Sequence, residues 1–298
     1  MRHLVLVGST ASGKSALALE VARRLNDVEL VSADSMQVYR GMDIGTAKAT
    51  PAERAEVPHH LVDVAEPEED YSVARFQTEV AEVIAGIEAR GRRALVVGGT
   101  GLYVQAVVDG LCLPGEWPAL RSELEGEPPE DLHRRLAGLD PLAASRIEPG
   151  NTRRLVRALE VTLGSGRPFS SFGPGLGAYP PTPRFRLAGV WLPRAVLAER
   201  IEARYRDQLA AGFGDEVRSL QARMSRTARQ ALGYRELLAH LAGDCSQEEA
   251  VATAVNRTRQ FARRQRAWFR RDPRITWLGA GGNPVDLLPA LLGDWSSP

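Results

Sequence analysis

The 298-residue sequence has few cysteines, few lysines and no long apolar run. Cys112 and Cys245 have no second cysteine or histidine at the spacing of a metal site, so the sequence indicates neither a zinc site nor a disulfide framework. No segment reaches the roughly 18 apolar residues of a membrane-spanning helix, and the apolar run near the N-terminus is too short for a secretory signal. We therefore expect a cytoplasmic protein without a membrane partner, whose 44% hydrophobic and 25% charged residues are typical of globular domains.

The scarcity of lysine makes the distribution of the arginines informative. Lys14 and Lys48 are the two lysines, and arginine supplies almost all of the remaining positive charge. Because genomic base composition can by itself favour arginine, the clustering matters more than the residue type. Between Val251 and Arg274 one acid, Asp272, is accompanied by eight arginines, at positions 257, 259, 263, 264, 266, 270, 271 and 274. This cluster favours a phosphate-backbone partner, and a solvated helix face is the alternative explanation.

A complete phosphate-binding sequence, G-x-x-x-x-G-K-S, occupies residues 8–15 directly after the apolar run Leu4–Val7. In this setting a short buried strand leads into a glycine-rich turn, whose backbone N–H groups can surround phosphate oxygens at the start of a helix. Lys14 would reach the terminal phosphate, and the Ser15 hydroxyl would bind Mg²⁺. The predicted phosphate-binding residues are Gly8, Ser9, Thr10, Ala11, Ser12, Gly13, Lys14 and Ser15.

Further apolar runs at residues 28–32, 94–97 and 186–192 are each followed by a helical pattern. This alternation predicts an α/β fold in which a parallel sheet of the P-loop type is flanked by helices. Residues 72–89 also carry an apolar stripe at helical spacing, which ends before Gly91.

The character of the sequence changes near residue 114. Residues 114–130 contain four prolines and five acids, a poor setting for a core strand, and helical stretches follow at 131–139 and 153–163. Residues 164–183 are rich in Gly, Pro and Ser, which indicates a loop or hinge. We therefore predict a helical insertion domain at 114–185 within a core formed by 1–113 and 186–298. The C-terminal region is predicted to be helical at 194–211, 215–224, 228–241 and 247–271, with a last strand at 275–278.

Polar residues follow two of the predicted strands, whose carboxyl ends would share one crevice. Asp34 follows the strand at 28–32 and could hold a metal, accept a proton or cap a helix; the sequence does not rank the first two roles. The strand at 94–97 is followed by Gly-Gly-Thr-Gly with Thr100, where a nucleotide hydrolase normally has a metal-binding aspartate. Residues 35–48 lack periodicity and mix polar, aromatic and glycine residues, which is typical of a binding loop.

These motifs resemble the tRNA dimethylallyltransferase family, also called the tRNA isopentenyltransferase family, of the bacterial type. After the glycine-rich loop come Ala-Asp-Ser-Met-Gln-Val-Tyr-Arg-Gly-Met-Asp-Ile-Gly-Thr-Ala-Lys at residues 33–48 and Val-Gly-Gly-Thr-Gly-Leu-Tyr at 97–103. Further matches lie at 59–63, 153–161, 200–204, 230–235 and 258–268. The resemblance covers essentially the whole chain.

The resemblance implies transfer of a dimethylallyl group from dimethylallyl diphosphate to N6 of adenine 37, beside the anticodon of tRNA, with release of pyrophosphate. It makes Asp34 the general base, places Thr100 against the leaving group and lets Arg204 stabilise the departing charge. The prenyl diphosphate would occupy the glycine-rich loop with Mg²⁺ as the cofactor. No nucleotide hydrolysis would be needed, and the enzyme is expected to be a monomer.

The resemblance also implies a tRNA surface on the insertion and on the basic C-terminal helix. The residues that would contact tRNA are Asp34, Ser35, Met36, Gln37, Thr100, Arg121, Arg153, Arg154, Arg157, Gln230, Gly233, Tyr234, Arg235, Arg263, Arg264 and Gln265. Trp268 and Phe269 could stack on bases, although aromatics at helical spacing more often belong to the core. The chain departs from the family pattern at Ser9, usually proline, at Arg153, commonly glutamine, and in a shorter segment before Asn151.

Two other functions are compatible with parts of this pattern. An ATP-dependent small-molecule kinase would use the same loop and crevice, but would need neither the arginine cluster nor the glycine-rich turn at Thr100. A non-catalytic RNA-binding protein with a vestigial phosphate site would have no reason to keep Lys14, Ser15 and Asp34 together.

Overall fold

The computed structural model describes residues 2–173 and 175–296. By their internal contacts they form two compact units, one drawn from residues up to 109 together with those from 180 onward, the other from residues 110–179. The insertion predicted at 114–185 concerns the same part of the chain as the second unit.

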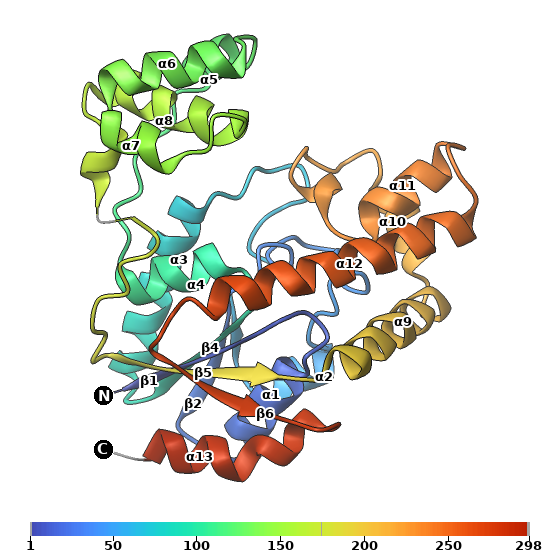
Figure 1. Ribbon diagram of the computed structural model, residues 1–298. Helices are drawn as coiled ribbons and strands as arrows, with labels where there is room; N and C mark the ends of the chain where they lie inside the picture. The colour runs from blue at the N-terminus through green and yellow to red at the C-terminus, as the bar shows by residue number, and fades with distance from the viewer. Residues whose placement is uncertain (1, 174, 297–298) are drawn as a thin grey trace. The chain divides into compact units, whose positions relative to one another are not determined.

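The first unit contains a six-stranded sheet whose neighbouring strands are all parallel, as predicted. Its strands are β1 (His3–Gly8), β2 (Val28–Ser32), β3 (His59–His60), β4 (Arg93–Gly98), β5 (Phe185–Trp191) and β6 (Ile275–Gly279), in the order β3-β2-β4-β1-β5-β6 (Figure 1). The five strands predicted from apolar runs are confirmed. The two residues of β3 are too few to produce a periodic pattern in the sequence.

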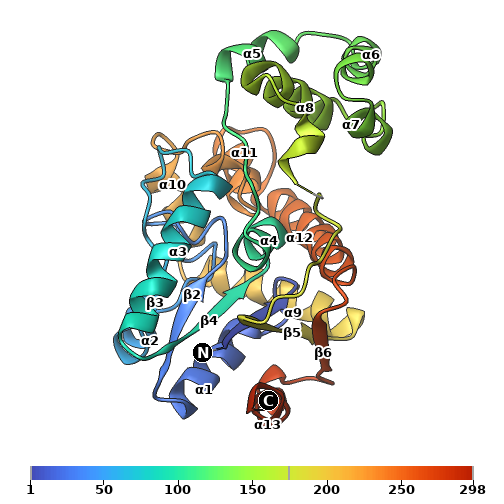
Figure 2. The ribbon, with the colours of Figure 1, turned by 90° about the vertical axis from the view of Figure 1, so that its left-hand side faces the viewer.

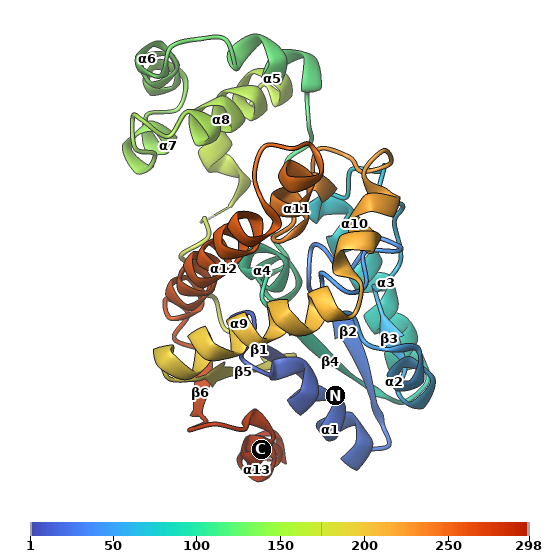
Figure 3. The same ribbon diagram turned by 90° about the vertical axis from the view of Figure 1, so that its right-hand side faces the viewer.

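Helices cover both faces of this sheet. The helices of this unit are α1 (Lys14–Arg24), α2 (Pro51–Glu56), α3 (Val73–Ala89), α4 (Gly101–Asp109), α9 (Arg194–Ala210), α10 (Phe213–Leu220), α11 (Tyr234–Leu241), α12 (Gln247–Phe269) and α13 (Leu288–Ser296), with 3₁₀ turns η2 (Ala228–Gln230) and η3 (Pro284–Leu287). Helix α10 packs on α9 and α11, and α11 packs on α12. Figures 2 and 3 show α1 and α13 on one side of the sheet and α3, α4 and α12 on the other.

The sheet separates two apolar clusters, one on each of its faces, and the side chains of β1 contribute to both. Successive side chains of a strand point to opposite faces. Leu4 and Leu6 therefore pack in the cluster that contains the apolar residues of α1 and α13, whereas Val5 and Val7 pack in the cluster formed with α3, α4 and α12. All four side chains are fully buried, so β1 lies at the centre of the fold and delivers the glycine-rich loop from a rigid strand.

Helix α3 confirms the predicted apolar stripe. Phe76, Val80, Ile84 and Ile87 are buried at i, i+4, i+8 and i+11, and they belong to the apolar cluster on the face of the sheet that α4 and α12 also cover. The helix begins after Ser72, whose hydroxyl accepts a hydrogen bond from the backbone N–H of Arg75 at 3.2 Å.

The second unit consists of short helices around its own small core. They are α5 (Pro118–Leu124), α6 (Pro129–Leu139), α7 (Pro141–Arg146) and α8 (Thr152–Ser165), followed by the 3₁₀ turn η1 (Phe169–Phe172). The helices predicted at 131–139 and 153–163 are confirmed as α6 and α8. Leu124, Leu132 and Leu155 are fully buried between them, which gives this unit an apolar centre.

The helix predicted at 228–241 is wrong in its extent, because the chain forms η2 and then α11, with Gly233 between them at φ 86°. That backbone conformation ends one helical segment before the next begins.

Among residues 2–173 and 175–296, no helix combines the length and the apolarity that crossing a bilayer demands.

Candidate active site

Three neighbouring strands bring the predicted site residues to one edge of the sheet. Strand β4 pairs with β1 on one side and with β2 on the other, so the loops after residues 8, 32 and 98 leave the sheet next to each other. The approach is so close that a Cβ atom on Gly98 would lie 2.3 Å from the carbonyl oxygen of Ala33. Glycine at position 98 is therefore required by backbone proximity.

The glycine-rich loop has the conformation of an anion site. Ala11 and Gly13 adopt positive φ values of 60° and 79°, and α1 begins immediately afterwards at Lys14. The first backbone N–H groups of α1, at the positive end of its dipole, are thus directed at the loop. Pro284 of η3 lies against Gly13, where an added Cβ would come within 2.4 Å of its ring.

The Lys14 ammonium group lies among protein atoms at this loop. In the described part of the chain it has neither a hydrogen bond nor an ion pair with a carboxylate. Burial lowers its pKa to about 8; nearby Asp34 acts in the opposite direction, and Arg204 adds to the lowering. A partly buried cation without a partner is costly, so this position favours a bound anion.

Helix α9 supplies two arginines on one face, because Arg200 and Arg204 are four residues apart. Arg204 donates to the Thr10 hydroxyl at 3.1 Å and to the carbonyl of Gly45 at 3.3 Å, and burial lowers its pKa. Arg200 donates to the carbonyl of Ala11 at 3.0 Å. Arg200 is a site residue without a predicted role, and its position one helical turn before Arg204 is the sequence signal that could have identified it.

Asp34 is fixed in the turn that follows β2. One oxygen of its carboxylate accepts a hydrogen bond from the backbone N–H of Met36 at 2.9 Å, and the other has no hydrogen-bond partner among the described residues. The hydroxyl of Thr100 accepts from the backbone N–H of Ser35 at 3.2 Å. Thr100 thus ties the turn of Asp34 to the loop after β4.

These groups surround one cavity of about 490 Å³. The predicted site residues that line it are Thr10, Ala11, Gly13, Lys14, Ser15, Asp34, Ser35, Met36, Gln37, Thr100, Arg204, Gln230, Arg264 and Gln265. All three predicted catalytic residues are therefore among them. Arg121, Arg153, Arg154 and Arg157 belong to the second compact unit.

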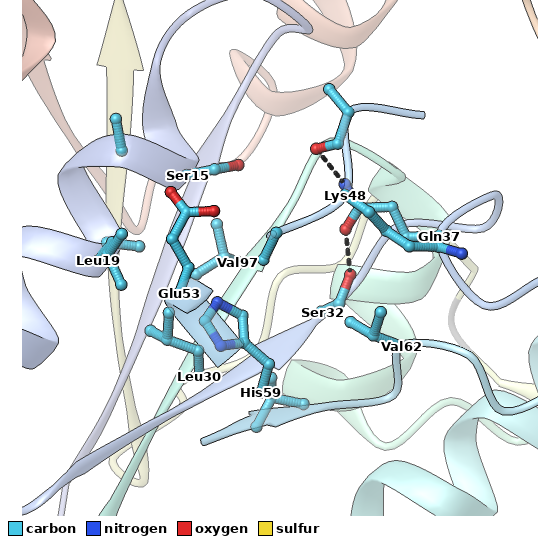
Figure 4. Close-up of a pocket in the computed structure, with 15 residues that line it drawn as sticks. Ser15, Leu19, Leu30, Ser32, Gln37, Lys48, Glu53, His59, Val62 and Val97 are labelled. Atoms are coloured by element: carbon cyan, nitrogen blue, oxygen red, sulfur yellow. Dashed lines mark hydrogen bonds between the residues drawn. The ribbon is translucent and has the colours of Figure 1, made fainter. Parts of the chain in front are cut away.

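A smaller cavity of about 220 Å³ adjoins the first and shares Ser15, Gln37, Ala47 and Val97 with it (Figure 4). Figure 4 shows the Gln37 side chain beside Ser32, whose hydroxyl donates to Gln37 at 3.0 Å. The amide nitrogen of Gln37 donates to the Ala47 carbonyl at 3.3 Å. Gln37 therefore forms part of the wall between the two cavities.

The loop of residues 35–48 is held by two charged residues that the sequence analysis does not single out for this role. The buried ammonium group of Lys48 lies 2.5 Å from carboxylate oxygens of both Asp43 and Asp63. The carboxylate of Glu216 accepts hydrogen bonds from three successive backbone N–H groups, those of Asp43, Ile44 and Gly45, at 2.7–3.1 Å. Both roles depend on tertiary packing, which a sequence pattern does not reveal.

The arginine cluster on and after α12 divides into two groups. Arg257 pairs with Glu236, Arg259 with Glu202, and Arg274 with Asp272 and Asp109. In the part of the chain that the structure describes, the other arginines have no carboxylate partner within salt-bridge distance: Arg263, Arg264, Arg266, Arg270 and Arg271. Such unneutralised charge is typical of a surface that binds a polyanion.

The aromatic residues beside these arginines belong mainly to the core. Phe269 is buried, and Trp268 packs so closely on α4 that a Cβ on Gly101 would lie 2.4 Å from its ring. Arg271 lies over the ring of Trp268 at 4.8 Å from the centroid.

The remaining residues predicted to contact tRNA differ in exposure. Arg153, Arg154, Arg235, Arg263 and Arg264 are exposed, as is Gln230. Gly233, Tyr234 and Gln265 are buried. Arg121 and Arg157 are partly buried, and both contact the fully buried carboxylate of Glu160. The contacts with tRNA remain predictions.

Comparisons with known proteins identify relatives of this chain. A family model described as IPP transferase matches residues 37–272. A Streptomyces coelicolor protein named tRNA dimethylallyltransferase is 49% identical over 97% of this chain and 94% of its own length. The crystal structure of a Bacillus halodurans tRNA isopentenylpyrophosphate transferase is 37% identical, with a TM-score of 0.71 over 98% of this chain and 96% of that one.

A eukaryotic dimethylallyltransferase, crystallised while acting on tRNA, is 28% identical with a TM-score of 0.80, covering 94% of this chain and 74% of its own. The comparisons give no support to the small-molecule kinase. From the family match and the relatives of nearly equal length, the chain belongs to the IPP transferase family.

Proposed function

We propose that this protein transfers the dimethylallyl group of dimethylallyl diphosphate to N6 of adenine 37 in tRNA and releases pyrophosphate. The observation that carries the proposal is a single cavity that combines a glycine-rich anion loop, partly buried cations and a carboxylate with one unpartnered oxygen, beside a basic helix. No step in this reaction consumes a nucleotide.

The diphosphate would lie in the loop of residues 8–15, between the N-terminus of α1 and the cations of α9. As the bond between the allylic carbon and the oxygen breaks, the electron pair and the growing negative charge pass to pyrophosphate. Lys14, Arg204 and the loop N–H groups are already in place and stabilise that charge without reorganising. Thr100 completes this side of the cavity.

The residues present fit Mg²⁺, which prefers hard oxygen ligands, keeps several waters and binds through one or two protein oxygens together with substrate phosphates. Ser15 offers an exposed hydroxyl that lines the cavity, and the described residues contain no cluster of three or more His, Cys, Asp or Glu for a cage of protein ligands. When bound, the ion would neutralise part of the charge on the leaving group.

Asp34 would act as the general base. The N6 amino group forms the new carbon–nitrogen bond and loses one proton, which the unpartnered oxygen of Asp34 accepts. The hydrogen bond from the Met36 N–H holds the other oxygen and so orients the carboxylate toward the cavity.

For adenine 37 to reach this cavity it must leave the stack of the anticodon loop, which costs a few kcal/mol. The unpaired arginines of α12 would offset this cost by contacting the phosphates on either side. We also expect Arg121, Arg153, Arg154 and Arg157 of the second unit, and Gln230 and Arg235 of the first, to contact tRNA.

The test is an incubation of the purified protein with labelled dimethylallyl diphosphate, Mg²⁺ and unmodified tRNA that has adenines at positions 36 to 38. Label should enter the tRNA without ATP, and replacing adenine 37 by guanine should abolish the incorporation. Incorporation that requires ATP, or that is the same with guanine 37, would contradict the proposal. We also expect a cytoplasmic protein that is a monomer. Light scattering of the active protein would check that it is a monomer.

A further inference from the structure

The side chain of Gln265 connects the two glycine-rich loops of the site. It extends from α12 into the protein, where only 7% of the residue is exposed. Its amide oxygen accepts a hydrogen bond from the backbone N–H of Thr10 at 2.8 Å, and its amide nitrogen donates to the carbonyl of Gly99 at 2.8 Å. Among uncharged side chains, a carboxamide can both accept and donate in this way from one planar group.

The glycine at position 99 makes this connection possible. A Cβ on Gly99 would lie 2.4 Å from the amide nitrogen of Gln265, closer than any non-bonded atom can approach. Gly99 does not have a positive φ, so its backbone conformation does not require glycine. The absence of a side chain at position 99 is therefore explained by the approach of Gln265.

We propose that Gln265 is a positioning residue that sets the diphosphate loop and the Thr100 loop in their relative places, instead of a residue that contacts tRNA. This inference rests on the proposed function. It reassigns Gln265 from the tRNA surface, where the family resemblance places it, to the interior of the active site.

The bonding around Thr10 explains why such positioning matters. The Thr10 N–H is used by Gln265 and the Thr10 hydroxyl by Arg204, so both polar groups of this loop residue are fixed by helices from the C-terminal half of the chain. Without the Gln265 amide, the Thr10 N–H and the Gly99 carbonyl lose their partners together. The loop that binds the leaving group can then shift relative to Thr100, and a displacement of about 1 Å can cost about 100-fold in rate.

The substitution Gln265→Met keeps the length of the side chain and removes both hydrogen bonds. We expect it to weaken the binding of inorganic pyrophosphate with Mg²⁺, measured by calorimetry, and to lower kcat by about 10- to 100-fold, while tRNA affinity stays unchanged. Gln260→Met makes the same chemical change at an exposed position of α12 and is the matched control. It should leave pyrophosphate binding unchanged.

A second variant separates positioning from general loss of structure. Gly99→Ala introduces a methyl group where the Gln265 amide lies, so it should displace that amide and reproduce the weaker pyrophosphate binding. Because both substitutions break the same link, the double variant should be little worse than either single one. Additive effects would overturn the proposed link.

The inference is also overturned if Gln265→Met weakens tRNA binding and leaves pyrophosphate binding intact, since that pattern describes an RNA contact. Pyrophosphate binding is measured without tRNA. A wild-type protein that binds pyrophosphate but transfers no prenyl group would therefore refute the proposed function and leave the comparison of the Gln265 variants readable.

Discussion

Lys14 and Lys48 are the two lysines of the chain, and the protein treats them in opposite ways. Lys48 is buried and paired with two carboxylates, whereas Lys14 is placed at the phosphate loop without a carboxylate partner in the described part of the chain. A protein selected for stability alone would not keep an unpaired, desolvated cation. The cost at Lys14 is therefore consistent with a function that requires an anion to bind there.

Replacing Lys14 by methionine should stabilise the free protein. The pKa of Lys14 is lowered from 10.5 to about 8, so the unfolded chain holds this proton more tightly than the folded one. At pH 7 Lys14→Met should raise the free energy of unfolding by about 1–3 kcal/mol. The wild type should recover this difference as pH rises from about 8 to 10.5, where the folded lysine is neutral first.

Urea denaturation of both proteins at pH 7 and pH 10 measures this effect. Lys48→Met is the matched control and should destabilise by about 2–4 kcal/mol, because Asp43 loses its cation and Asp63 keeps only its ion pair with Arg54. If the Lys14→Met protein is less stable than the wild type at pH 7, the unpaired ammonium group of Lys14 does not destabilise the folded protein, and the prediction is wrong.

The sequence allows prediction of those site residues whose position follows from the backbone. Lys14, Asp34 and Thr100 each follow a strand, and parallel strands end at a common edge, so their convergence is expected. Glu216 and Gln265 reach the site by side-chain contacts across more than 150 positions of sequence: the Glu216 carboxylate accepts a hydrogen bond from the Gly45 N–H, 171 residues away, and the Gln265 amide donates to the Gly99 carbonyl, 166 residues away. No local pattern contains that information.

At the scale of elements, α12 has two distinct sides. Its buried residues include Ala262, Gln265 and Phe269, which face the sheet and the glycine-rich loops, while Arg263 and Arg264 are exposed. One helix thus carries both a component of the active site and a charged outer surface. This arrangement gives the arginine cluster seen in the sequence a definite orientation.

The double substitution Arg263→Ala and Arg264→Ala should weaken tRNA binding and reduce the slope of log affinity against log salt by about 1 to 2. Filter binding at several salt concentrations measures the slope. The control protein carries Arg23→Gln and Arg218→Gln, which remove two ion-paired surface arginines elsewhere, and it should keep the wild-type slope. Equal slopes for the wild type, the control and the α12 double variant would contradict a tRNA surface on α12.

The elements themselves differ in how far the sequence predicts them. Helices α1 and α3 have long apolar stripes and are predicted correctly. Helix α4 is predicted only as a helical pattern after the strand at 94–97, without bounds, because it starts inside the glycine-rich turn at Gly101 and is nearly apolar all round, with Tyr103, Val104, Ala106 and Val108 buried. A helix that is buried on most sides lacks the amphipathic period by which helices are recognised.

At the scale of the whole molecule, the second compact unit contains a buried carboxylate of its own, which two arginines neutralise. Glu160 is fully buried and accepts hydrogen bonds from the Trp117 N–H at 2.8 Å and from Arg121 at 3.0 and 3.2 Å, and it pairs with Arg157 at 3.1 Å. Burial acts to raise the pKa of Glu160, but these partners outweigh it and hold the pKa below its usual value. The carboxylate therefore stabilises this unit above pH 4.5 and ceases to do so as the pH falls through its lowered pKa.

Glu160→Gln keeps an acceptor for Trp117 and removes the charge, which leaves two arginines without their anion. We expect residues 110–179 to lose about 2–4 kcal/mol of protection in hydrogen exchange, while the sheet of the first unit keeps its protection. Glu130→Gln, at an exposed position in the same unit, is the control. Equal loss of protection in both units would show that they do not open independently.

The central claim is that prenyl transfer takes place in the cavity at the carboxyl ends of β1, β2 and β4, with Asp34 as the base. The most direct measurement is the single-turnover rate of label transfer from dimethylallyl diphosphate to tRNA, for wild type and for Asp34→Asn, with both substrates saturating. The account predicts a rate about 10²–10⁴-fold lower for Asp34→Asn, with tRNA affinity nearly unchanged. An Asp34→Asn protein that transfers the prenyl group at the wild-type rate would contradict it.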